Sequence, residues 1–195
     1  MQLTDLRNLL PGAALAALAV LLVGSPSGAE EQPQLMPTRD VDIAYVVTRP
    51  HQPTLRERAR WSAAERLERV DGPGKSITIF DRDAKLITLI IPASRSYRKI
   101  ERAPRRPMEP EKGALLARGA ESVVAKLRCV DWSWTEDAET HTICATADGV
   151  LLRLVVDGKT VIEARSVSYA PQRPDLFRVP PGYAPALAPE GGLAD

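Results

Sequence analysis

The sequence is poor in the residues that most catalytic and metal-binding sites use. It has two histidines and two cysteines in 195 residues. Neither His51 nor His141 is part of a His-x-x-x-His motif or of a cluster of Cys and His residues, so no zinc pattern is present. The chain also lacks a Gly-x-Ser-x-Gly motif, a glycine-rich phosphate loop and a dinucleotide-binding fingerprint. We therefore expect neither an enzyme nor a cofactor.

An excess of one charge is also lacking. There are 26 Lys plus Arg against 25 Asp plus Glu, a net charge of +1 that argues against a nucleic-acid partner. The charge is unevenly spread, however, because residues 49–106 hold 15 basic and 7 acidic residues. Here Arg56, Arg58 and Arg60 alternate along one predicted strand and so share a face. They predict either a surface for an anionic partner or a solvated outer face that resists aggregation.

The apolar run near the N-terminus, residues 9–23, is too short to cross a bilayer. It has 15 residues, whereas a membrane-spanning helix needs about 20. Arg7 precedes the run, and the small residues Ser27 and Ala29 stand where a signal peptidase reads. We predict a signal peptide over residues 1–29 that uses the Sec route and is cleaved after Ala29. The mature protein is then periplasmic and not integral to the membrane, whereas an uncleaved anchor is the alternative.

Aromatic residues are few: the chain has nine in all, so aliphatic side chains must line most of any core or ligand site. Residues 30–40 are polar with two prolines and predict a flexible leader. We expect one domain over residues 41–183 and a disordered tail over residues 184–195. Alternating apolar residues predict strands within residues 41–49 and 54–62. Further strands are expected over 76–80, 85–91 and 96–101, and the run 85–91 is apolar on both faces.

The C-terminal half has the clearest turn signals. The pairs Asp148-Gly149 and Asp157-Gly158 stand between alternating apolar runs, as in two-residue hairpin loops. They predict a four-stranded antiparallel meander over residues 127–169.

The two cysteines fit this meander. If Glu136 and Asp137 form the tip of its first hairpin, Cys129 and Cys144 lie directly opposite each other. Cross-strand neighbours are within disulfide range, so we predict a structural disulfide in an oxidising compartment. A redox-active pair is the alternative, but the chain has no Cys-x-x-Cys spacing.

Residues 113–127 carry the pattern of the one helix expected after the signal peptide. Leu115, Leu116 and Val123 belong to an apolar stripe at helical spacing. The helix either packs as ordinary core or acts as a lid over a cavity for an apolar ligand. The strand residues expected to line this core or cavity are Ile77, Ile79, Leu86 and Ile90. The fold class is mainly β (α+β): a curved antiparallel sheet or unclosed half-barrel with one helix packed on it.

Three sequence segments give the chain a family resemblance: RWSAAERLERVD, TADGVLLRLVVDGKTVIEARSVSY and DLFRVPPGY. With the signal peptide and strand order, they resemble exported proteins of the LolA-like and LppX-like superfamily. The resemblance implies an unclosed antiparallel barrel with helices on its open side, and a binding role without catalysis. The implied partner is a lipid or a lipoprotein acyl chain held inside the sheet. The alternative is an envelope protein that the same fold docks or senses without a ligand.

Overall fold

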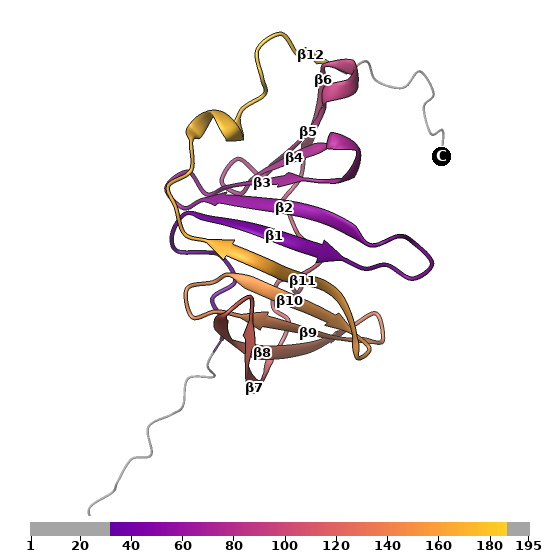
Figure 1. The fold of residues 1–195 in the computed structure, drawn as a ribbon, viewed down its shortest axis with the longest axis vertical. Coiled ribbons are helices and arrows are strands. Elements are labelled where there is room, and N and C mark those ends of the chain that lie inside the picture. Colours follow the sequence, from indigo (N-terminus) through magenta and orange to yellow (C-terminus); the bar gives the residue numbers. More distant parts are fainter. Residues whose placement is uncertain (1–31, 187–195) are drawn as a thin grey trace, which may run out of the picture. The chain divides into compact units, whose positions relative to one another are not determined.

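The computed structural model describes residues 32–186, which form one sheet of twelve strands (Figure 1). The signal peptide and its cleavage site lie outside the described residues. The strands are β1 (Val41–Val47), β2 (Leu55–Ser62), β3 (Leu67–Asp71), β4 (Ile77–Asp81), β5 (Leu86–Ile91), β6 (Ser96–Glu101), β7 (Ala117–Val124), β8 (Leu127–Glu136), β9 (Glu139–Ala145), β10 (Leu151–Val156), β11 (Lys159–Ser168) and β12 (Ala184–Pro185). Three short 3-10 turns are η1 (Pro73–Lys75), η2 (Pro92–Ser94) and η3 (Pro174–Phe177).

The sheet consists of two meanders joined by one long-range pairing. Its strand order is β12-β6-β5-β4-β3-β2-β1-β11-β10-β9-β8-β7. All neighbours are antiparallel except β12 and β6, which are parallel. The seam between the meanders is β1 against β11, where Asp42 pairs with Ser168. The sheet is not closed, because β12 and β7 end the order and do not pair with each other. The mainly β, unclosed part of the predicted fold is therefore confirmed.

Alternation along β1 defines the two faces of the sheet. Val41, Ile43, Tyr45 and Val47 are buried, and the residues between them are only half-buried. This is the period-2 pattern of a strand with one side on the core. We call the side that carries these four residues the inner face and the other side the outer face.

The helix predicted over residues 113–127 is wrong. Ala117–Val124 form β7, and this strand pairs with β8 from Ala117 opposite Ser133 to Val124 opposite Leu127. Ala125 and Lys126 make the tight turn between the strands, with φ angles of 49° and 67°. Cross-strand pairing therefore overrides the helical preference of this Ala- and Leu-rich segment. The turn is hidden in the sequence because it contains none of Gly, Asn or Asp.

The first C-terminal hairpin has its tip one residue later than predicted. Asp137 and Ala138 occupy the turn, with φ angles of 49° and 64°. Cys144 is consequently opposite Asp131 rather than opposite Cys129. The two cysteines are diagonal neighbours and still bond, with a Cα–Cα distance of 5.4 Å. The disulfide prediction is confirmed, and the register behind it is wrong.

Residues 102–116, which we call the connector, cross the inner face of the sheet. They join β6 to β7, two strands that follow each other in the chain but lie near opposite ends of the strand order. Met108 in the connector is fully buried within the hydrophobic core, and Leu116 packs against that core. The connector therefore occupies the position where the sequence predicted a packed helix.

The segments outside the strands are also placed on the sheet. In the predicted leader, Leu35 and Met36 pack against the core, and the Thr38 amide donates to the Asp148 carbonyl over 2.9 Å. In the predicted tail, Ala184–Pro185 form β12. Residues 187–195 lie outside the described part of the chain.

Candidate functional site

The residues predicted to line an apolar core or cavity fall into two groups. Those on the sheet are buried or half-buried: Ile77, Ile79, Leu86 and Ile90. Leu116 is half-buried, whereas Leu115 and Val123 are 80% and 69% exposed. The structure therefore does not bring the seven side chains together around one cavity. Val123 faces solvent on the edge strand β7, and Leu115 lies just before that strand instead of in a helix packed on the sheet.

A cluster of four charged side chains, two buried glutamates and two half-buried arginines, lies where the connector crosses the sheet. Arg82, in the β4–β5 turn, contacts Glu109 of the connector over 2.5 Å and Glu68 of β3 over 3.4 Å. Arg106 of the connector contacts Glu68 over 2.7 Å. The two arginines and two glutamates balance in charge, and two of their three ion pairs join the connector to the sheet side of the cluster. We call them the inner charge cluster.

Aromatic rings border the inner charge cluster. The Arg106 guanidinium lies 5.6 Å from the centre of the Tyr45 ring, and the Arg82 guanidinium lies 6.0 Å from that of Trp61. The Tyr45 hydroxyl donates to the Leu151 carbonyl over 2.6 Å. The cluster is thus held between strands of both meanders, because Tyr45 belongs to β1 and Leu151 to β10.

Burial shifts the protonation equilibria of this cluster. It raises the pKa of Glu68, an effect that the neighbouring Arg106 and Arg82 only partly oppose. It also raises the pKa of Tyr45 to about 12. Burial alone would lower the pKa of Arg106, but Glu68 and Tyr45 raise it above its ordinary value. Arg106 therefore stays cationic, so the connector places a permanent positive charge beside the core.

The space left between the connector, the N-terminal segment and the sheet is small. One cavity there is bordered by Met36, Tyr45, Trp61 and the inner charge cluster, and its volume is about 20 Å³. A water molecule fits such a space, whereas small-molecule sites usually measure about 300–1,000 Å³. Larger hollows, such as one of about 560 Å³ beside the connector, are open to solvent and bordered by charged residues including Arg102, Arg105 and Glu139.

The three arginines of the predicted anionic-partner face lie on the outer face of β2. Arg58 donates to Asp42 over 2.7 Å, and Arg60 pairs with both Asp42 and Asp71. Burial alone would raise the pKa of Asp71, but hydrogen bonds and charge from Arg69 and Arg60 lower it below its ordinary value. Within residues 32–186, Arg56 is the member of the three that forms no ion pair. Carboxylates therefore neutralise most of this face.

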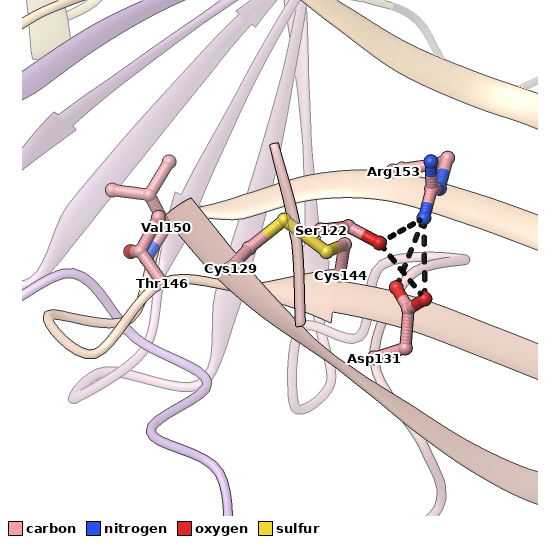
Figure 2. The surroundings of a disulfide bond; sticks show 7 residues. All are labelled: Ser122, Cys129, Asp131, Cys144, Thr146, Val150 and Arg153. Carbon is pink, nitrogen blue, oxygen red and sulfur yellow. Dashed lines mark hydrogen bonds and ion pairs between the residues drawn. A yellow bond between two sulfur atoms is a disulfide. The ribbon is translucent and has the colours of Figure 1, made fainter. Parts of the chain in front are cut away.

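The disulfide lies beside a second polar cluster, shown in Figure 2. Arg153 of β10 reaches across β9 to Asp131 of β8 over 3.0 Å, and Ser122 of β7 donates to the same carboxylate over 3.2 Å. Cys129 and Cys144 are both buried. These contacts link β7, β8, β9 and β10 on one side of the sheet, and so their role is structural.

Residues 32–186 contain neither a cluster of metal-ligand side chains nor a long apolar helix. Over residues 32–186, no three His, Cys, Asp or Glu side chains gather closely enough to hold a metal ion. None of the helical turns in this range has the length or apolar content of a bilayer-spanning helix.

Sequence reasoning missed the inner charge cluster. Its members come from β3, the β4–β5 turn and the connector, and no local pattern links them. Glu68 was the one available signal, because its direct partner across the β2–β3 pair is the buried Trp61. That signal becomes readable only when the strand register is known.

Comparisons with solved structures show where the fold occurs. An uncharacterised conserved protein from Thermus thermophilus matches with a TM-score of 0.57 at 14% identity, over 76% of this chain and 90% of that one. A chain of the Pseudomonas aeruginosa MucA/MucB complex matches with a TM-score of 0.50 at 14% identity, over 71% of this chain and 55% of that one. PNGF-II matches with a TM-score of 0.50 at 11% identity, and this chain spans 30% of it.

These likenesses show a shared fold. At 11–14% identity they show nothing beyond the fold. No protein-family model matches the chain, and no curated protein matches it at the sequence level.

Proposed function

We propose that this chain is an exported, non-enzymatic module of the bacterial envelope that binds a partner protein on the outside of a filled sheet. The observation that carries the proposal is the connector, which occupies the inner face and leaves a cavity of about 20 Å³. A binding protein of this fold with a filled interior must use its surface. The MucA/MucB complex supports the proposal, since that neighbour of the same fold is itself bound to another protein.

An apolar ligand inside the sheet is the second candidate, favoured by the LolA-like resemblance. For a lipid to enter, the connector must leave the inner face and withdraw Met108 from the core. Its departure would also break the contacts of Glu109 and Arg106 with the sheet. Glu68 and Arg82 would then keep only each other as counter-ions, and removing one partner from a buried ion pair costs about 3–5 kcal/mol. This cost ranks the lipid ligand below the protein partner.

Native mass spectrometry of the full chain, isolated from the periplasm of a producing cell, tests the proposal. We expect a polypeptide that begins at Glu30, contains the disulfide and carries no lipid. A stoichiometric lipid adduct would overturn the proposal in favour of the second candidate. A chain that keeps residues 1–29 would overturn the exported, cleaved form.

Matched connector variants make the test sharper. Glu109→Ala removes a buried carboxylate that Arg82 holds, whereas Glu111→Ala removes an exposed one two residues later. We expect a fluorescent fatty acid to bind neither the wild type nor Glu111→Ala, and to bind Glu109→Ala once the connector is loosened. Binding to the wild type with one-to-one stoichiometry would contradict a filled interior.

A further inference from the structure

The two edges of the sheet differ in how they are covered. At one end β12 pairs with β6: the Ala184 amide donates to the Arg95 carbonyl over 3.0 Å, and the Ala186 amide donates to the Tyr97 carbonyl over 2.7 Å. At the other end β7 pairs with β8 alone. The outward backbone groups of β7 therefore have no strand partner among residues 32–186. The chain protects one edge with its own tail and leaves the other open.

Two exposed apolar side chains lie at the two ends of the open edge. In the described part of the chain, three large apolar side chains are exposed: Leu115, Val123 and Ile91. Leu115 comes just before β7, and Val123 lies near its end. An open edge flanked by exposed apolar residues is what proteins usually avoid, because it pairs readily with another strand. The combination points to a strand that has a partner.

The charge beside β7 selects the kind of partner. Residues 112–128 contain four basic residues and one acidic residue. Lys126 and Arg128, at the β7–β8 turn, are exposed and form no ion pair with any described residue. A second copy of this chain would bring the same positive excess to the edge, whereas an acidic segment would neutralise it. An extended acidic chain is therefore the complementary occupant.

We propose that β7 is the docking edge of this protein and that an extended, acidic segment of the partner adds to it as a further strand. This inference rests on the proposed function and names its surface. Main-chain hydrogen bonds to β7 provide affinity in such strand addition, and side chains at alternate positions provide specificity. A bulge interrupts the β7–β8 register between Arg118 and Glu121, so the regular docking stretch is residues 121–124. Val123 supplies its apolar contact, and Arg128 supplies the contact for a carboxylate.

The probe for this edge is a blocked peptide of alternating Val and Glu, eight residues long like β7. We expect it to slow amide hydrogen exchange of the full chain over residues 121–124 and to raise the anisotropy of a labelled copy. A peptide of alternating Val and Lys should bind about tenfold more weakly or less, because like charges then face each other. Slowed exchange at another strand, or none at residues 121–124, would overturn the inference.

Two matched variants distinguish binding at β7 from non-specific binding to exposed apolar residues. Val123→Glu places a carboxylate on the docking stretch and should weaken the acidic peptide about tenfold or more. Ile91→Glu makes the same change at an exposed apolar residue of β5 and should leave binding unaltered, with both variants checked for an unchanged melting curve. Equal loss in both variants, or a dimer protected at β7 without peptide, would overturn the inference. If the acidic peptide does not bind and native mass spectrometry still finds no lipid, β7 is ruled out as the docking surface and the proposed function stands.

Discussion

Asp148, in the turn between β9 and β10, fastens the N-terminal segment to the sheet. Its carboxylate accepts hydrogen bonds from Arg39 over 2.8 Å, from Thr146 over 2.5 Å and from Tyr169 over 3.2 Å. The Arg39 guanidinium also lies 3.6 Å from the centre of the Tyr169 ring. One turn residue thus connects the segment before β1 with the end of β11.

The pH dependence of stability should report this carboxylate. Burial alone would raise the pKa of Asp148, but the hydrogen bonds from Thr146, Arg39 and Tyr169 lower it below its ordinary value. Its contribution to stability is therefore complete at neutral pH and is lost in acid, as the pH falls through the ordinary and then the lower folded-state pKa. Asp148→Asn should cost about 1 kcal/mol at neutral pH and progressively less in acid. Urea unfolding from pH 2 to 7 measures this, with Asp137→Asn on the exposed β8–β9 turn as the control. A difference in unfolding free energy between the wild type and Asp148→Asn that stays constant with pH would contradict the prediction.

Gly149, the next residue, allows the N-terminal segment to approach the turn. Its φ is +90°, and a Cβ added there would lie 2.1 Å from the Met36 carbonyl oxygen. Gly149→Ala should therefore lower the free energy of unfolding by about 3 kcal/mol, from backbone strain plus overlap. Gly158→Ala is the matched control, because its φ is +74° but nothing lies within 4 Å of the added Cβ. It should cost only about 1 kcal/mol in the same denaturation experiment. Equal losses of unfolding free energy in the two variants would contradict the prediction and would mean that the N-terminal segment moves away from the added methyl group.

At the scale of the element, the β8–β9 hairpin is held by the Cys129–Cys144 disulfide. The bond closes a loop with a sequence separation of 15, which corresponds to about 3 kcal/mol in the chain-entropy model. Replacing both cysteines by Ala should lower the unfolding free energy by about that amount and leave the far-ultraviolet circular dichroism unchanged. Reduction of the wild type should give the same shift in melting temperature. A reduced protein with an unaltered melting curve would contradict the prediction.

The elements differ in how far the sequence alone specifies them. Where Gly follows Asp, at Asp148-Gly149 and Asp157-Gly158, both turns are predicted at the right place, because Gly adopts positive φ without strain. The second is the predicted two-residue loop, whereas the first is longer, because β9 ends at Ala145 and β10 begins at Leu151. Where the turn is Ala125-Lys126, no residue type marks it, and the apolar spacing of the flanking segment predicts a helix instead. An edge strand also lacks the alternation that burial imposes on a central strand, because most of β7 is exposed on both sides.

The functional candidates are harder to predict for a related reason. The inner charge cluster depends on the connector crossing the sheet, and that crossing follows from which strands lie at the two ends of the order. Alternation reveals which face a residue occupies, but it does not reveal which strands are neighbours. Alternation therefore predicts that Arg56, Arg58 and Arg60 share a face. It cannot predict that Asp42 and Asp71 neutralise this face, because those contacts depend on the pairing of β2 with β1 and β3.

At the scale of the whole molecule, the β1–β11 seam has a consequence for how the chain acquires its structure. Each meander consists of strands that follow one another in the sequence, so its hairpins close locally and early. The seam pairs Asp42 with Ser168 and cannot form until nearly the entire described chain has been synthesised. β1 therefore keeps one side unpaired until β11 follows it, as β6 does until β12 follows. Because the seam joins residues so distant in sequence, we expect it to close more slowly than the hairpins.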